Sequence, residues 1–154
     1  MSSIHIFESM VPCMYTFTHS IGLSGLPSAA EIRQIVFVDE QGFSDEYDDI
    51  DPVAHHLVLF SDGKPAATAR LFCDSGTVWH IGRMAVLREF RGIGLGAMVM
   101  SELEKKAAEL GATEIVLSSQ KQASGFYEKL GYEPFGEEYL DQHCPHISMR
   151  KFLS

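Results

Sequence analysis

The alternation of apolar and polar positions in the first half of the chain is typical of β-strands. Residues 4–18 alternate and contain β-branched side chains, which predicts a first strand. Two short apolar runs, 56–60 and 66–72, flank an Asp-Gly turn and predict a β-hairpin. A longer strand is predicted at 77–86. Short turns join the last three of these strands, which indicates an antiparallel arrangement.

Helical spacing of apolar residues marks three other segments. Ser28-Ala-Ala-Glu31 is typical of a capping box and predicts the start of a helix. Helices are also predicted at 94–110, where Gly111 fits the position after the helix end, and at 122–130. The first helix is expected to bury Ile32, Ile35, Val36 and Phe37. The second is expected to bury Leu95, Met98, Val99, Leu103 and Leu110.

The remaining strands complete the predicted sheet. A buried strand is predicted at 114–118, and two strands at 133–140 and 146–152 finish the chain. Antiparallel strands come first, then a strand–helix–strand unit, then a helix and more strands. This order predicts an α+β fold with a mixed central sheet flanked by helices. At 154 residues, we expect one domain that covers positions 1–154.

Composition is that of a globular protein in a reducing compartment. Hydrophobic residues make up 45% of the chain, close to the globular average. No apolar run reaches the roughly 20 residues that span a bilayer, and the first ten residues lack the features of a signal peptide. The three cysteines, Cys13, Cys73 and Cys144, are far apart and form no CxxC pair. We therefore expect a cytoplasmic protein that does not associate with a membrane.

The net charge of −9 argues against nucleic acid as a partner, because binding phosphates requires a basic surface. Seven carboxylates gather in one segment: Asp39, Glu40, Asp45, Glu46, Asp48, Asp49 and Asp51. One interpretation is a solvated loop, which charge runs commonly form. The other is an electrostatic attraction for a cationic amine substrate.

A glycine-rich turn between the 77–86 strand and the next helix is a candidate anion site. In Arg91-Gly-Ile-Gly-Leu-Gly96 the glycines let the backbone approach an anion, and the first helical turn offers unpaired amides. Arg88 and Arg91 add positive charge. Gly96-Ala-Met98 lacks the Lys-Ser/Thr of a Walker loop, and the glycine spacing differs from a dinucleotide fingerprint. Taken alone, the segment is also compatible with a plain turn.

Two motifs resemble signatures of the GNAT superfamily of N-acetyltransferases. Arg91-x-x-Gly94-x-Gly96 is similar to its coenzyme A pyrophosphate motif, and Ile81–Val86 is similar to the strand that precedes it. Residues 123–132, Ala-Ser-Gly-Phe-Tyr-Glu-Lys-Leu-Gly-Tyr, are similar to its second signature. Residues 36–41, the acidic segment and Pro145–Met149 further resemble the bacterial ElaA/YjcF-like subgroup. The likeness covers roughly residues 28–152.

The resemblance implies acetyl-coenzyme A (acetyl-CoA) as co-substrate and a primary amine that attacks the thioester directly, without a metal. It also implies that the 81–86 strand splays from its neighbour at 115–118, and that main-chain amides of Met84, Ala85 and Val86 polarise the thioester oxygen. The coenzyme-binding residues that it implies are Arg91, Gly92, Ile93, Gly94, Leu95, Gly96 and Phe126. A homodimer through sheet edges, which often pair in this family, is a further expectation.

Tyr127 and His80 are the candidates for proton transfer. Tyr127 matches the family tyrosine that faces the coenzyme sulfur, and a phenol with a pKa of about 10 is a plausible donor to a leaving thiolate. The alternative is a core aromatic residue. His80 lies where related histone acetyltransferases carry a glutamate, and its alternative is a strand histidine without a chemical role. Four further residues are expected on the acceptor side: Glu40, Asp51, His55 and His146.

Three other functions compete with amine acetylation. A metal site at His143-Cys-Pro-His146 is disfavoured, because the proline interrupts the segment and strand neighbours point to opposite faces. Transfer to an aminosugar phosphate requires a basic pocket, for which Arg33, Arg70 and Arg83 are the candidates. A non-catalytic coenzyme A sensor would keep the glycine loop without the chemistry. We predict an amine N-acetyltransferase whose acceptor is a small cationic amine.

Overall fold

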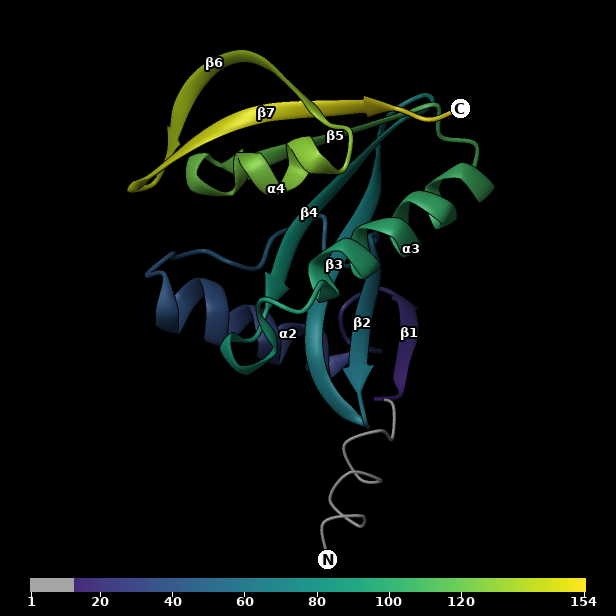
Figure 1. The fold of residues 1–154 in the computed structure, drawn as a ribbon, viewed down its shortest axis with the longest axis vertical. Coiled ribbons are helices and arrows are strands. Elements are labelled where there is room, and N and C mark those ends of the chain that lie inside the picture. The colour runs from purple at the N-terminus through teal and green to yellow at the C-terminus, as the bar shows by residue number, and fades with distance from the viewer. Residues whose placement is uncertain (1–12) are drawn as a thin grey trace, which may run out of the picture.

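The structure, a computed structural model, describes residues 13–154 and contains a seven-stranded sheet in the order β1-β2-β3-β4-β5-β7-β6 (Figure 1). The strands are β1 (Tyr15–Ile21), β2 (His55–Ser61), β3 (Lys64–Ser75), β4 (Val78–Val86), β5 (Glu114–Gln120), β6 (Glu133–Asp141) and β7 (Cys144–Phe152). The helical segments are α2 (Pro27–Arg33), the π-helix η1 (Gln34–Glu40), the short η2 (Arg88–Phe90), α3 (Leu95–Glu109), the short η3 (Lys121–Ala123) and α4 (Ser124–Lys129). Only β4 and β5 pair in parallel, so the sheet is mixed, as predicted.

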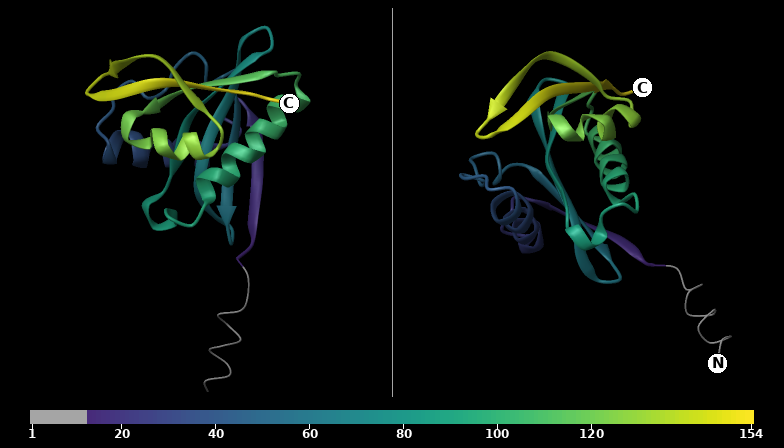
Figure 2. Two further views of the ribbon diagram at one scale, coloured as in Figure 1. Left: turned by 45° about the horizontal axis from the view of Figure 1, so that its top comes forward. Right: turned by 60° about the vertical axis from the view of Figure 1, so that its left-hand side comes forward.

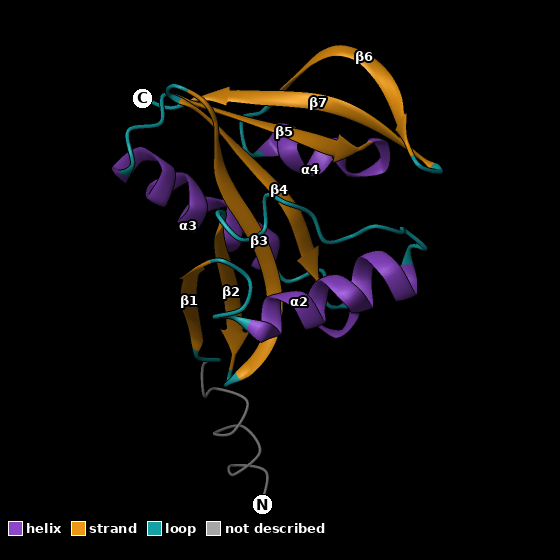
Figure 3. Ribbon diagram, turned by 180° about the vertical axis from the view of Figure 1, so that it is seen from behind, coloured by secondary structure: helices purple, strands orange, loops and turns teal. Residues whose placement is uncertain are grey.

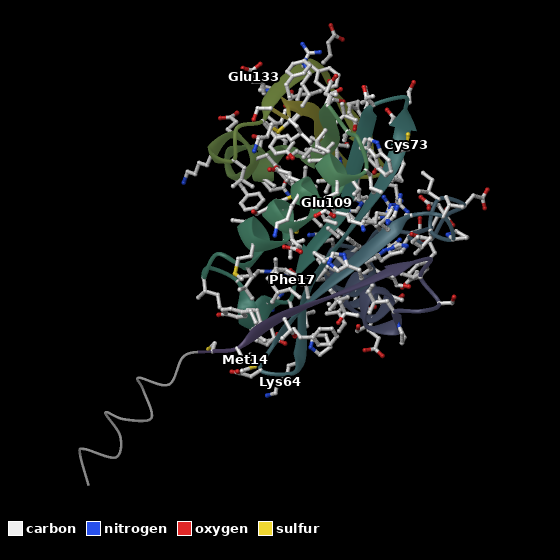
Figure 4. All side chains as sticks on the ribbon, turned by 90° about the vertical axis from the view of Figure 1, so that its right-hand side faces the viewer. Met14, Phe17, Lys64, Cys73, Glu109 and Glu133 are labelled. Carbon is white, nitrogen blue, oxygen red and sulfur yellow. The ribbon has the colours of Figure 1, made fainter. Side chains whose placement is uncertain are left out.

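Each predicted strand has a counterpart in this sheet. The first strand differs most, since it was predicted at 4–18 and β1 begins at Tyr15 and ends at Ile21. Residues 4–12 of that prediction lie outside the described part of the chain. The β2–β3 hairpin is confirmed, and β3 extends from Lys64 at one end of the molecule to Cys73 near the other (Figure 4).

The start of the first helix was predicted wrongly. No side chain caps α2, whose N-cap is Leu26 and whose first residue is Pro27, one position before the predicted capping box. Proline at the first helical position already supplies a suitable φ and needs no amide partner. Beyond Arg33 the chain continues as the π-helix η1, which changes the direction in which successive side chains point around the helix axis. Ile35 is therefore 47% exposed, whereas the other three predicted core residues, Ile32, Val36 and Phe37, are buried.

Helices cover both faces of the sheet. The helix α2 lies on one face, and α3 and α4 lie on the other (Figures 2 and 3). The face under α3 buries Leu95, Val99, Met100, Leu103 and Ala107 of that helix. Leu110, which was predicted in this core, is 40% exposed because it is already the C-cap. Gly111 follows with a φ of 94°, as its predicted position requires.

The sheet divides between β4 and β5. These two strands pair only from Val78 to His80, and beyond His80 they separate (Figure 1). The predicted splay of the central strand pair is thereby confirmed. One part of the sheet contains β1 to β4, and the other contains β5, β7 and β6.

The cysteines and helices complete the description of the fold. All three cysteines are free thiols, with Cys13 and Cys73 exposed and Cys144 buried. In the portion from residue 13 to residue 154, every helix is too short or too polar to cross a bilayer.

Candidate functional site

The separation of β4 from β5 opens a cavity of about 560 Å³. Its walls come from β4, the loop that leads into α3, the end of β5 and the start of α4. Parts of the segment 36–46 and the β6–β7 turn also line it. Of the predicted site residues, these line the cavity: His80, Met84, Ala85, Val86, Arg91, Gly92, Gly96, Phe126, Tyr127 and His146.

The β4 strand offers backbone groups that no neighbouring strand uses. Because β5 pairs with β4 only at Val78–His80, the β5-facing N–H and C=O groups of residues 81–86 have no ladder partner. On the other side of β4, a bulge places Arg83 and Met84 opposite the single residue Ala69. Arg83 adopts a φ of 52° at this bulge. Backbone amides of β4 can therefore donate into the cavity.

The loop from Arg91 to Gly96 presents a row of unbonded amides at the start of α3. Gly94 is the N-cap of α3, and its φ of 88° is a left-handed conformation that favours glycine. Within residues 13–154, the amides of residues 92–97 donate no hydrogen bond to the backbone. Amides at a helix start carry partial positive charge, and successive amides of this kind form a concave anion site. The loop therefore fits a diphosphate group.

Gly96 allows the loop to approach the aromatic ring of Phe126 closely. A Cβ atom built on Gly96 would lie 3.1 Å from Cζ of Phe126, which is too close without a shift of the ring. Ile93 is exposed, and Leu95 is buried in the core, so neither side chain points into the cavity. These two residues and Gly94 contribute to the loop through their backbone.

Arg91 is held by a carboxylate of the π-helix η1. Its two terminal nitrogens donate to the carboxylate oxygens of Glu40 at 2.8 and 2.9 Å, and its Nε donates to the Val86 carbonyl at 2.8 Å. The hydrogen bonds to Arg91 lower the pKa of Glu40 and raise the pKa of Arg91. Glu40 was predicted on the acceptor side, but the structure places it against the glycine loop instead.

Tyr127 lies in α4 and borders the cavity with only a small exposed fraction. Its ring packs edge-on against Phe126 and Tyr132, with centroids 4.9 and 6.0 Å away. Burial raises the pKa of the Tyr127 phenol to about 12, so the hydroxyl stays protonated at neutral pH. In the described part of the chain this hydroxyl has no hydrogen-bond partner within the protein. It is available as a donor to a ligand in the cavity.

His80 lies where β4 and β5 separate. Its ring stacks on Phe72 with a centroid distance of 4.8 Å and an interplanar angle of 17°. Burial lowers the pKa of His80 to about 4, against an opposing effect of Asp74, so the ring is uncharged at neutral pH. His80 is thus placed at the cavity as predicted, but its basicity is reduced.

The acidic segment forms a buried ion-pair network. The Arg33 side chain is 2.9 Å from Glu46 and 2.7 Å from Asp51. Arg70 is 2.7 Å from Asp48 and 2.8 Å from Asp51. Both arginines are almost completely buried, as are Glu46 and Asp51. The solvated-loop interpretation is therefore wrong for this part of the segment.

Arg83 joins the network at the cavity wall. Its Nε lies 2.9 Å from Glu46, and its Nη2 lies 3.3 Å from Asp48. Three arginines thereby neutralise three carboxylates, Glu46, Asp48 and Asp51, which weakens the predicted attraction of this segment for a cationic substrate. Asp45 lines the cavity and has no ion-pair partner in residues 13–154.

Besides Glu40, two of the residues predicted on the acceptor side lie outside the cavity. Asp51 is enclosed by the ion-pair network. His55 lies on β2, where its ring is 6.0 Å from the Trp79 ring. The expectation that these residues contact the acceptor fails because the register of β2 and the network direct them elsewhere.

Sequence reasoning missed several polar residues that link segments across the cavity. Gln120 of β5 donates to Gln41 at 2.7 Å. The β6–β7 turn is joined to the loop after η1, because the Ser44 amide donates to Gln142 at 2.9 Å and the Gln142 amide donates back to the Ser44 carbonyl at 2.7 Å. No local pattern marks these residues, since their partners lie 79 and 98 positions away in the sequence.

His143 and His146 both pack against Phe43, but only His146 lines the cavity. The His143 ring packs against Phe43 at 4.8 Å between centroids, and His146 lines the cavity. Across residues 13–154, no group of three or more His, Cys, Asp or Glu side chains is arranged to hold a metal ion.

Comparison with known proteins agrees with this arrangement. The family model described as an acetyltransferase (GNAT) domain matches residues 28–153. The chain is 36% identical over 129 residues to the N-acetyltransferase YjcF of Bacillus subtilis (strain 168), which covers 82% of this chain and 91% of the relative. An acyl-CoA N-acyltransferase from Pseudomonas aeruginosa is similar with a TM-score of 0.78 at 30% identity, over 91% of this chain and 99% of that one. Escherichia coli ElaA has the same TM-score and coverage at 25% identity.

Proposed function

Because this chain belongs to the GNAT family of acetyltransferases, we propose that it transfers an acetyl group from acetyl-CoA to a small primary amine. The observation that carries the proposal is the row of unbonded amides at residues 92–97, of which Gly92 and Gly96 line the same cavity as Tyr127. The amides match the diphosphate of a coenzyme thioester, and the Tyr127 hydroxyl matches its sulfur. A diphosphate needs donors, and a leaving thiolate needs a proton.

The glycine loop would hold the diphosphate through its backbone. Side-chain bulk at Gly96 is excluded by Phe126, and the Cβ position at Gly94 is open to a ligand. Arg91 would act indirectly, because Glu40 and the Val86 carbonyl already accept its hydrogen bonds. It orients the loop and links it to η1.

Amides of β4 would donate to the thioester oxygen as negative charge develops there. Tyr127, which burial keeps protonated, would donate its hydroxyl proton to the thiolate as the C–S bond breaks. A base has to accept the proton that the amine loses. The two histidines that line the cavity, His80 and His146, are the candidates.

The acceptor is proposed to be small and to carry a positive charge. The Ser44–Gln142 bridge joins the two segments that line the acceptor side, which limits the size of a ligand beneath it. Asp45 and Asp141 line the cavity and pair with no basic side chain in the described residues. An aminosugar phosphate is less well supported, because two of its three candidate arginines, Arg33 and Arg70, are buried in ion pairs and only the third, Arg83, lines the cavity.

Calorimetric titration with coenzyme A tests the first part of the proposal. Gly94→Val should weaken binding strongly, because the new side chain obstructs the amides and strains a backbone with φ of 88°. Gly111→Val is the matched control, since Gly111 has a similar φ of 94° and open space but lies at the other end of α3. Unchanged affinity in a folded Gly94→Val variant would refute the loop as the coenzyme site.

Thiol release tests the second part. Acetyl-CoA is incubated with 1,4-diaminobutane, with aniline, which is uncharged at neutral pH, or with glucosamine 6-phosphate. We expect the highest kcat/KM with 1,4-diaminobutane. Preference for the sugar phosphate would favour the alternative acceptor. Coenzyme binding without release of thiol with any of the three would favour a coenzyme A sensor.

A further inference from the structure

The cavity contains a histidine whose ring is oriented for proton transfer. We propose that His146 of β7, rather than His80, is the general base that accepts the proton of the attacking amine. This inference rests on the proposed N-acetyltransferase function and assigns one step of it.

One backbone hydrogen bond determines which nitrogen of His146 is free. Nδ1 lies 2.9 Å from the carbonyl oxygen of Cys144. A carbonyl oxygen can only accept, so Nδ1 carries the hydrogen and, in the neutral ring, Nε2 keeps its lone pair. In the region from residue 13 onward, Nε2 has no hydrogen-bond partner in the protein, and the residue lines the cavity. A base with one nitrogen oriented by a third group and the other free is the arrangement that proton abstraction requires.

Packing holds the His146 ring in this orientation. The residue is 6% exposed. Tyr139 stacks on the ring with centroids 5.9 Å apart and an interplanar angle of 28°, and Phe43 packs edge-on at 6.3 Å. His146 pairs with Gln120 of β5 on one side and with Tyr139 of β6 on the other. A ring that is fixed before the substrate binds loses little entropy in the reaction.

Titratable groups of three segments line the cavity with His146 or lie next to it in the sequence or on its ring. The loop after η1 contributes Asp45, and the β6 strand contributes Asp141 and the phenol of Tyr139. The β6–β7 turn contributes His143. The neighbour on β5, Gln120, is uncharged.

His80 lacks an orienting partner of this kind. Neither of its ring nitrogens forms a hydrogen bond within residues 13–154, and its ring lies flat against Phe72. Both histidines line the cavity, but only the ring of His146 has a determined tautomer.

In the proposed step the neutral amine, whose ammonium proton has already passed to solvent, forms a bond from its nitrogen to the carbonyl carbon and loses one proton to Nε2 of His146. The C–S bond breaks as Tyr127 protonates the sulfur. The proton on His146 then passes to solvent, and Tyr127 regains one from solvent. The products are the N-acetylated amine and the free thiol.

The test uses His146→Ala and His146→Gln in the thiol-release assay with acetyl-CoA and 1,4-diaminobutane. We expect kcat/KM to fall about 100- to 10,000-fold in both, the range for loss of a general base. The acidic limb of the pH profile of kcat/KM should disappear in both variants. Imidazole added to His146→Ala should restore part of the rate, and coenzyme A affinity should stay near the wild-type value. A structural role alone would produce neither the pH effect nor the rescue.

Two further variants complete the test. His143→Ala removes a neighbouring histidine that does not line the cavity, and its profile should match that of the wild type. In His80→Ala the acidic limb should persist. The inference is overturned if His146→Gln keeps both the wild-type kcat/KM and the acidic limb of its pH profile, or if that acidic limb is lost only in His80→Ala. If the wild-type protein neither binds coenzyme A nor releases thiol, the proposed function itself fails.

Discussion

Replacing Asp51 by asparagine should destabilise the fold, and the effect should depend on pH. Asp51 is enclosed by the network: its carboxylate accepts from Arg33 at 2.7 and 3.1 Å, from Arg70 at 2.8 Å and from the Asp48 amide at 3.1 Å. The neutral amide of the Asp51→Asn variant would leave two buried guanidinium groups short of one negative charge. Removing one partner of a buried pair typically costs about 3–5 kcal/mol.

The pH dependence follows from the pKa of Asp51. Burial alone would raise it, but the hydrogen bonds from Arg33 and the Asp48 amide, together with the charges nearby, lower the pKa from 3.8 to about 2. The gap between these two values is worth about 2 kcal/mol of folding free energy at neutral pH. A carboxyl group whose pKa is lower in the folded state stabilises the fold above its unfolded pKa, and this contribution is lost as the pH falls toward the folded pKa. By pH ~3, about 1 kcal/mol of it should be gone.

Urea unfolding at pH 6 and pH 3 measures both quantities. The difference in unfolding free energy between wild type and Asp51→Asn should be largest at pH 6 and smaller by about 1 kcal/mol at pH 3. Asp49→Asn is the control, because Asp49 is exposed and belongs to the same segment. A difference that is equal at the two pH values would show that Asp51 has no lowered pKa, and a stability like that of the wild type would refute the network as a structural element.

Two predictions concern the reaction. Tyr127→Phe removes one hydroxyl from a packed ring, so kcat should fall about 100- to 10,000-fold while the Kd for coenzyme A in calorimetry stays near the wild-type value. An unchanged kcat would assign protonation of the thiolate to another group. Replacing both Asp45 and Asp141 by asparagine should raise the KM for 1,4-diaminobutane more than the KM for aniline, because in the described residues only these two carboxylates line the cavity without a basic partner. Equal effects on the two amines would refute a cationic acceptor site.

Local patterns in the sequence were sufficient for most of the fold and for the glycine-rich loop at the cavity. Apolar periods of two and of 3.6 identified the strands and the long helix, because side-chain direction alternates along a strand and rotates along a helix. The glycine-rich loop was also identified locally, because its unpaired amides and the φ of Gly94 depend only on residues that are neighbours in the sequence. The capping box was wrong because Pro27, one position earlier, is an equally local and competing signal.

The acceptor side was decided by the tertiary structure. Asp51 appeared available for a substrate, but Arg33 and Arg70 approach it only when α2, its loop and β3 pack together. His146 was one of several candidate residues until β7 was placed between β5 and β6, where the Cys144 carbonyl orients its ring toward a cavity shared with Tyr127. Whether a charged or titratable side chain is neutralised or free depends on groups far away in the sequence. Coulombic and hydrogen-bond interactions act over a few ångströms of space, and only folding brings those groups within that distance.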